Sequence, residues 1–315
     1  MRRLALLLAA TAVALAGCGD DGGGGGGDGG PAKVRVSDTA GVPSAFLEYG
    51  VREGFFRKRD LDVEVQPSQG GATVVPAVVS GDVDIGGSNL VSVLLAQEKD
   101  IPVKIVAPGT FVDGTKDFAA IVVAKDSDIR SPADLEGKTL AVNTLKNVAE
   151  VTARASLDKQ GVDSSKVELT EVDFPDMTAA VEQGRVDAAF AIEPFVSQAA
   201  AAGNRIVDRP YVGTKPGLQI GCYFATEQYL AENEDVARRF REGVGETARA
   251  IAADPAAFRE FLPEASEIPP PAAQKAVLPA WRGSSDPESV DVIAELMQRY
   301  DITPDKPDTS EALAE

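Results

Sequence analysis

The spacing of apolar side chains alternates along the chain between the period of a strand and that of a helix. Residues 61–65, Leu-Asp-Val-Glu-Val, are apolar at every second position, as in a half-buried strand. Residues 46–56 carry apolar side chains at helical spacing as far as Gly54, where we expect the helix to stop. The same pattern predicts strands over residues 34–37, 83–86 and 103–107 and helices over residues 74–79 and 90–97. Strands that alternate with helices predict a mainly parallel sheet with right-handed crossovers.

An octapeptide of the first half of the chain returns in the second half. Residues 77–84 read AVVSGDVD and residues 180–187 read AVEQGRVD, so five of eight positions match at an offset of 103. In both places the block ends a predicted helix at glycine and begins a strand at valine. This shared order predicts an α/β fold of two similar lobes that follow each other in the sequence.

Two strand-like runs, residues 118–124 and 218–225, lie where the chain would pass between these lobes. Amphipathic helices are expected over residues 234–252 and 290–300. If they pack back on the first lobe, the chain crosses between the lobes twice, and such a hinge lets lobes close over a ligand. The predicted lobes are residues 33–121 plus 224–315 for the first and residues 122–223 for the second.

The N-terminus has the pattern of an export signal over residues 1–17, with Arg2 and Arg3, an apolar run and small residues. The run is shorter than the about 20 residues that a membrane-spanning helix needs. The sequence Leu-Ala-Gly-Cys that ends at Cys18 resembles the bacterial lipobox, in which the cysteine receives the lipid. An ordinary cleaved signal with an incidental Cys18 is the alternative. Residues 18–32, mostly Gly and Asp, predict a flexible tether to a lipid anchor.

Composition excludes several functions. The net charge of −18 disfavours nucleic acid as a partner, because such binding rests on neutralising phosphates. The chain has no histidine, so histidine-dependent catalysis and histidine-ligated metal sites are absent. Cys222 is the only cysteine besides Cys18, which leaves no intrachain disulfide once Cys18 is lipidated. We expect a monomeric binding protein without enzyme activity, cofactor or metal, held at the membrane only by its lipid.

Six segments occur in a recognisable order: YGVREGFF from residue 49, LDVEV from 61, GGA from 70, SGDVDIGGSN from 80, DLEGKTLAV from 134 and EQGRVDAAFAIEPF from 182. Together they resemble the periplasmic solute-binding proteins of the nitrate, sulfonate, taurine and thiamine-pyrimidine precursor group. The resemblance covers about residues 33–260. It implies a type II periplasmic-binding-protein fold, in which two Rossmann-like lobes hold a ligand in a central cleft. It also implies delivery of the solute to the permease and ATPase subunits of an ABC importer.

In open parallel sheets, ligands bind beyond the carboxyl ends of the strands. Several loops at these ends are also helix starts, whose free N–H groups and positive dipole ends favour anions. The site residues predicted by this rule are Asp38, Thr39, Val42, Pro43, Ser44, Gln69, Gly70, Gly71, Ser88 and Asn89 in the first lobe, and Asn143, Thr144, Lys146, Asn147 and Glu193 in the second.

The identity of the ligand stays open between two chemistries. Lys146, the only basic residue in these loops, could pair with a sulfonate, nitrate or carboxylate, or it could be a solvated lysine. Asp38 and Glu193 could hold an ammonium or a ring N–H, or they could be turn and cap residues. The aromatic content of 6% favours a small polar solute over a flat heteroaromatic one. A surface lipoprotein that senses a ligand without a transporter is the third alternative.

Overall fold

The computed structural model describes residues 30–266, 268–310 and 312–314. The predicted export signal, the lipidation of Cys18 and nearly all of the predicted tether lie outside the described residues. Residues 31–315 form one compact unit. Within the described part of the chain, no helix combines the length and the apolar character needed to cross a membrane.

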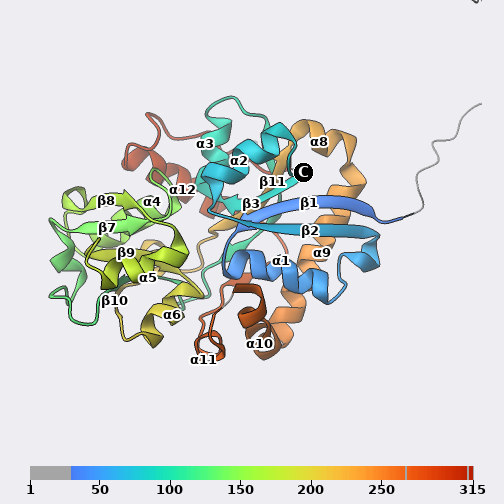
Figure 1. The fold of residues 1–315 in the computed structure, drawn as a ribbon. Helices are drawn as coiled ribbons and strands as arrows, with labels where there is room; N and C mark the ends of the chain where they lie inside the picture. The colour runs from blue at the N-terminus through green and yellow to red at the C-terminus, as the bar shows by residue number, and fades with distance from the viewer. Residues whose placement is uncertain (1–29, 267, 311, 315) are drawn as a thin grey trace, which may run out of the picture. The chain divides into compact units, whose positions relative to one another are not determined.

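Two five-stranded sheets form the centres of two lobes (Figure 1). The first sheet has the order β2-β1-β3-β11-β4, and the second has the order β10-β6-β9-β7-β8. In each sheet four strands run in the same direction and the fifth, β11 or β6, is inserted antiparallel between two of them. The two orders are the same once β7, β8, β9, β6 and β10 are matched to β1, β2, β3, β11 and β4. The predicted α/β fold of two similar lobes is therefore confirmed.

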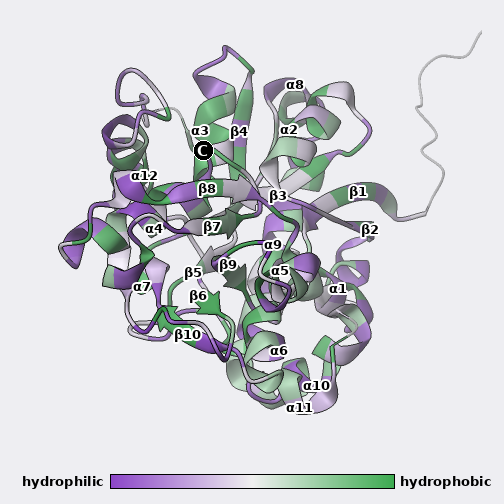
Figure 2. Ribbon diagram, turned by 60° about the vertical axis from the view of Figure 1, so that its left-hand side comes forward, coloured by the Kyte–Doolittle hydropathy of each residue, from purple (hydrophilic) through white to green (hydrophobic). Residues whose placement is uncertain are grey.

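The strands of the first sheet are β1 (Ala32–Thr39), β2 (Leu61–Ser68), β3 (Ile85–Asn89), β4 (Val103–Pro108) and β11 (Gly221–Thr226). Those of the second are β6 (Ala119–Val123), β7 (Thr139–Val142), β8 (Glu168–Glu171), β9 (Ala188–Ile192) and β10 (Arg205–Asp208). A small third sheet pairs β5 (Thr110–Phe111) with β12 (Ala280–Trp281). Hydrophobic residues gather on inner strands such as β6, whereas the outer strand β8 is largely hydrophilic (Figure 2).

Helices cover both faces of the two sheets (Figure 1). They are α1 (Val42–Arg52), α2 (Gly71–Ser80), α3 (Leu90–Gln97), α4 (Val148–Lys159), α5 (Phe174–Glu182), α6 (Phe195–Ala201), α7 (Pro210–Thr214), α8 (Glu227–Glu232), α9 (Glu234–Ala253), α10 (Pro255–Ser266), α11 (Pro270–Ala273) and α12 (Pro287–Arg299). Three 3₁₀ turns, η1 (Arg57–Arg59), η2 (Pro132–Leu135) and η3 (Ser164–Lys166), complete the set.

The helix predicted over residues 46–56 lies earlier in the chain, as α1. It starts at Val42 because Pro43 is well suited to the first turn, where no backbone N–H is needed. It ends at Arg52, two residues before Gly54, which has a left-handed φ of 74°. By contrast, α3 has the predicted bounds, and the Asn89 side chain caps it by accepting the N–H of Ser92 at 3.1 Å.

The last residue of each repeated octapeptide is an aspartate that accepts a backbone N–H from a neighbouring strand. The Asp84 carboxylate accepts the backbone N–H of Arg35 in β1 at 2.7 Å, and the Asp187 carboxylate accepts that of Thr139 in β7 at 2.9 Å. Each aspartate therefore ties the end of a helix–strand connection to the neighbouring strand. These two carboxylates belong to the scaffold and do not form a pair.

The chain crosses between the lobes at and just before the first residues of the strand-like runs that we predicted as the crossings. Those runs form β6 and β11, each inside a sheet, because their apolar side chains are buried on both faces. The crossings are residues 112–118 and 215–220. They are hydrogen-bonded to each other, with the N–H of Val112 donating to the carbonyl of Leu218 at 2.9 Å. The two antiparallel connections form the predicted two-strand hinge.

The C-terminal helices contact both lobes. Helices α9 and α10 pack on α1 in the first lobe, as expected. Helix α12, however, packs against α3 of the first lobe and α4 of the second, and α11 contacts α6. The expectation that all C-terminal helices return to the first lobe is therefore wrong, because the apolar face of α12, including Ile293 and Met297, is buried between the lobes.

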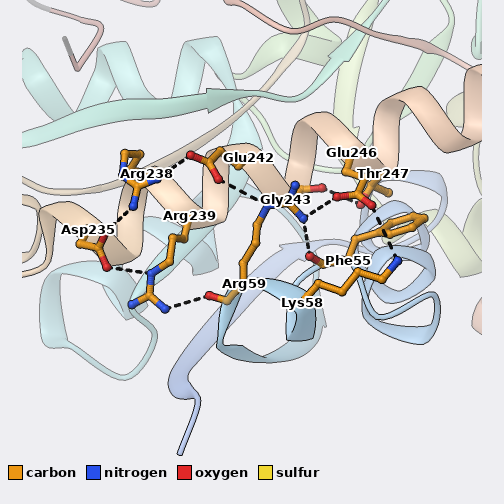
Figure 3. Close-up of polar contacts among 10 residues, drawn as sticks. All are labelled: Phe55, Lys58, Arg59, Asp235, Arg238, Arg239, Glu242, Gly243, Glu246 and Thr247. Carbon is orange, nitrogen blue, oxygen red and sulfur yellow. Dashed lines mark hydrogen bonds and ion pairs between the residues drawn. The ribbon is translucent and has the colours of Figure 1, made fainter. Parts of the chain in front are cut away.

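The long helix α9 is fixed to η1 by charged groups (Figure 3). The Arg59 guanidinium lies 2.5 Å from the Glu246 carboxylate and also donates to the carbonyl of Phe55 at 2.7 Å. Arg239 donates to the carbonyl of Arg59 at 2.8 Å. On the buried side, the rings of Phe56 and Phe240 stack with centroids 5.5 Å apart.

Three of the four outer strands of the two sheets are covered or charged. Along β4, the N–H of Ile105 donates to the carbonyl of Ala312 at 3.0 Å, and the N–H of Ala314 donates to the carbonyl of Ile105 at 2.9 Å. The opposite edge strand, β2, exposes Glu64 and half-exposes Asp62. In the second lobe, β8 exposes carboxylates at both of its ends.

Candidate functional site

A cavity lies between the two lobes beside the hinge. Its lining in the first lobe and hinge is Asp38, Thr39, Pro43, Ser88, Asn89, Gly109, Thr110, Phe118, Ile220, Gly221, Cys222 and Tyr223. Its lining in the second lobe is Asn143, Val148, Phe174, Ile192 and Tyr211. The parallel strands β1, β3 and β9 meet it at their carboxyl ends, where the general rule for open sheets places ligands.

The cavity is small because the lobes are in contact around it. Its volume is about 40 Å³, space for a few water molecules at about 10–15 Å³ each. Across its mouth, the Asn143 side chain donates to the carbonyl of Gln69 at 3.0 Å. Farther out, the Asn147 side chain donates to the Ser92 hydroxyl at 3.1 Å. These contacts join the second lobe to the first.

The Asp38 carboxyl group is buried at the centre of this lining, with only 3% of the residue exposed. It accepts the Thr39 N–H at 2.7 Å and the hydroxyl of Tyr223. Burial raises its pKa to about 7, since neither hydrogen bond offsets the loss of water. The backbone of Gly87 packs directly beneath it: a Cβ there would lie 2.3 Å from the Asp38 Cγ. Within the described ranges, no lysine or arginine pairs with Asp38.

Two further polar residues, Ser88 and Cys222, belong to the cavity lining. Ser88 is 7% exposed, and its buried hydroxyl has no hydrogen-bond partner among the described residues. A buried polar group without a hydrogen-bond partner is uncommon in folded proteins. The Ser88 hydroxyl lies near Gly71, where an added Cβ would be 2.9 Å from it. The thiol of Cys222 lies in the same wall, and burial together with the Asp38 charge raises its pKa.

Aromatic rings form much of the remaining wall. Phe118 and Tyr211 are in contact, with ring centroids 5.1 Å apart. Phe174 stacks on Phe195 behind it at 6.1 Å. Tyr223 completes the set from β11. The low overall aromatic content therefore does not describe the site, where aromatic side chains converge from both lobes.

Six of the residues predicted for the site line the cavity: Asp38, Thr39, Pro43, Ser88, Asn89 and Asn143. The other nine lie around it. Val42 and Ser44 are buried in the first turn of α1, Gln69 and Gly70 form the start of α2, and Asn147 caps α4. Gly71, Thr144 and Lys146 line a separate outer depression together with Asn147.

Lys146 and Glu193 were predicted to contact the ligand, but neither residue lines the cavity. The Lys146 side chain is exposed, its backbone has a left-handed φ of 51°, and its N–H donates to Glu150 at 2.8 Å. Glu193 is buried and accepts the backbone N–H groups of Ser197 and Val277, each at 3.0 Å. Its carboxylate joins α6 to the C-terminal segment.

The residues that the strand-end rule missed come mainly from β11, the hinge and α7. Strand β11 is antiparallel, so it meets the cavity with its first residues, Gly221 to Tyr223, and not with its carboxyl end. Nothing in the local pattern distinguishes these positions. The strand-end rule does reach the loop at Phe174, which starts the helix that follows β8, but Phe174 was not among the predicted site residues.

Comparison with known proteins places this geometry in a family. The family described as NMT1/THI5 like matches residues 44–258, more than half of the chain. The taurine-binding periplasmic protein of Escherichia coli (strain K12) is 23% identical over 201 residues, which are 64% of this chain and 61% of that protein. The formylaminopyrimidine-binding protein of Halalkalibacterium halodurans is 29% identical over 143 residues, 45% of this chain and 42% of that protein. The chain thus spans less than two thirds of these relatives.

Solved structures share the fold at low identity. The alkanesulfonate-binding protein SsuA from Xanthomonas axonopodis pv. citri, bound to MOPS, superposes with a TM-score of 0.77 at 19% identity, over 90% of this chain and 99% of that one. The aliphatic sulphonate binding protein SsuA from Escherichia coli has a TM-score of 0.72 at 18% identity, over 90% and 92%.

The family match runs from the first turn of α1 into α10 and so includes most of the cavity wall. Strand β1, which carries Asp38, lies before the residues that the family matches, and the fold shared with the solved structures covers 90% of the chain. The chain belongs to the NMT1/THI5 like family and has the two-lobed type II periplasmic-binding-protein fold.

Proposed function

We propose that this protein captures a small polar solute in the interlobe cavity outside the cytoplasm and delivers it to an ABC importer. The observation that carries the proposal is the cavity itself, which is lined from both lobes beside a two-strand hinge. A site of this kind forms and opens as the lobes move, which suits capture and release better than chemistry. The relatives named as taurine-binding and formylaminopyrimidine-binding support the same role.

A flat heteroaromatic solute is the second candidate. It is favoured by the aromatic rings that both lobes contribute to the cavity lining, those of Phe118, Phe174, Tyr211 and Tyr223. A simple anion such as nitrate has less support, because no lysine or arginine of the described chain lines the cavity. Backbone N–H groups at helix starts would have to hold it alone.

The solute-capture proposal is tested by blocking the cavity. In Asn143→Trp the new ring would fill the space between the lobes, so we expect loss of the thermal stabilisation that solutes give the wild type. Leu145→Trp, in the same loop but exposed and outside the lining, is the matched control and should keep it. A screen of sulfonates, amino acids and pyrimidines by thermal shift supplies the solutes. Equal shifts in both variants would contradict the proposed site.

Transport is separated from sensing by an uptake measurement. Deletion of the gene should abolish uptake of the solute identified in the screen if the protein serves permease and ATPase subunits. Unchanged uptake would favour a ligand-sensing surface lipoprotein.

We also propose that Cys18 carries the lipid that holds the protein at the membrane. Cys18→Ala is expected to release the protein into the soluble fraction and to abolish labelling by radioactive palmitate. Cys222→Ala is the control and should leave labelling unchanged, because the Cys222 thiol is buried beside the cavity. Continued labelling of Cys18→Ala would contradict the lipobox prediction.

A further inference from the structure

The charge balance of the cavity is unusual. Asp38 contributes a carboxyl group to the lining, and the described lining contains no side-chain cation to neutralise it. The titratable groups that face Asp38 are Glu48 of α1 and Cys222 and Tyr223 of β11, none of which is cationic. A buried carboxylate without a cation is costly, so folded proteins retain one mainly where it has a use.

The hydrogen-bonding capacity of Asp38 is also incomplete. An ionised carboxylate offers about four lone-pair positions. Two are used, by the Thr39 N–H and the Tyr223 hydroxyl. The cavity provides the direction from which further donors could reach the carboxylate, since the Gly87 backbone blocks the side toward β3.

The groups around Asp38 suit a ligand that brings donors. The rings of Phe118, Phe174 and Tyr211 line the same cavity, and an aromatic ring attracts a cation electrostatically. An anionic group placed beside Asp38 would meet repulsion instead.

We propose that the solute carries a protonated nitrogen, an ammonium or an amidinium-like ring N–H, which pairs with Asp38 inside the interlobe cavity. This inference rests on the proposed function and specifies the class of solute. Any acidic group of the same solute would lie away from Asp38, toward the backbone N–H groups at the helix starts of the second lobe.

The test uses pairs of molecules that differ only in the nitrogen. Taurine and isethionate share a sulfonate but carry an ammonium or a hydroxyl, and an aminomethylpyrimidine can be compared with its hydroxymethyl analogue. We expect calorimetry at pH 8 to show at least tenfold tighter binding of the nitrogen-bearing member in at least one pair. Asp38→Asn should reduce that preference at least tenfold.

Asp62→Asn, on the outer strand β2, is the matched control and should leave the preference unchanged. A melting temperature of Asp38→Asn no lower than that of the wild type would show that a loss of binding is not a loss of folding.

The two proposals fail in different ways. If solutes without nitrogen bind as tightly as their partners, and Asn143→Trp still abolishes that binding, solute capture stands and the role of Asp38 is overturned. Retention of the preference in Asp38→Asn overturns it as well. If none of the screened solutes binds the wild type, the proposed function falls and this inference falls with it.

Discussion

At the scale of single residues, the Asp38 carboxyl group opposes folding at neutral pH. Its pKa of about 7 in the folded protein lies above its ordinary value, because burial disfavours the charged form. A raised pKa means that the folded state binds the proton more tightly than the unfolded state. The stability that depends on this proton is fully present below about pH 4 and is lost as the pH rises through 7.

Asp38→Asn should therefore stabilise the unliganded protein, and more so at pH 8 than at pH 5. We expect the free energy of unfolding to rise by about 2 kcal/mol at pH 8, since one pKa unit corresponds to about 1.4 kcal/mol and lost hydrogen bonds offset part of the gain. Urea denaturation at the two pH values measures it. A variant less stable than the wild type at pH 8 would show that the carboxylate is well compensated in the folded state.

Glu193 is a buried carboxyl group with the opposite role. Burial raises its pKa too, but it accepts hydrogen bonds from Ser197 and Val277 and so joins the second lobe to the C-terminal segment. Glu193→Ala should cost about 2–3 kcal/mol, because it leaves buried donors unpaired. Glu193→Gln keeps acceptors at the site and should cost less. Chemical denaturation distinguishes them, and equal small effects would argue against this structural role.

At the scale of elements, α1, η1 and α9 approach closely at glycines. A Cβ on Gly243 of α9 would lie 2.5 Å from the Phe56 ring, whereas one on Gly245 would meet only the flexible end of Arg249 at 3.4 Å. Both glycines are in the same helix, so they differ in packing and not in helix propensity.

Gly243→Ala is expected to destabilise the protein by about 1–3 kcal/mol through overpacking. Gly245→Ala should be neutral or stabilising by up to about 1 kcal/mol, because alanine favours the helix. Thermal unfolding of the two variants tests this difference. The idea of a tight α9–η1 contact would be rejected by equal melting temperatures.

The direction and chain order of the strands determine which site residues could be predicted from the sequence. Period-two and helical spacing predicted elements such as β2 and α1 of the first lobe because these bury one face and expose the other. The strand-end rule reached Asp38, Ser88 and Asn143 for the same reason. It could not reach Gly221 to Tyr223, since β11 returns from a distant part of the chain and runs antiparallel. Nor could it orient Lys146, whose exposure follows from the backbone turn at that residue.

At the scale of the whole molecule, two polar contacts near the cavity are among the interactions that join the lobes. Asn143 and Ser92 each take part in one hydrogen bond between the lobes. Each such bond is worth about 1 kcal/mol. Helix α12 also packs between the lobes, so the loss of these two bonds weakens the closed arrangement about the two-strand hinge without removing every contact.

The double variant Asn143→Ala/Ser92→Ala should favour separated lobes. We expect a larger radius of gyration than that of the wild type by small-angle scattering, and compaction when a solute from the screen saturates the site. Leu145→Ala, in the same loop but without an interlobe bond, is the control. Identical scattering of the double variant and the wild type would mean that other contacts hold the lobes together.

The covered and charged outer strands affect how copies of the protein interact in concentrated solution. An unpaired edge strand is a template for a neighbouring molecule. Here the backbone of β4 is occupied by the segment around Ala312, and β2 and β8 carry carboxylates, so two molecules that meet edge to edge repel each other. That protection is electrostatic on β2 and β8 and disappears when carboxylates are protonated. Mild acid, at a pH where the fold still persists, should therefore make the protein self-associate, and it should do so sooner at high salt.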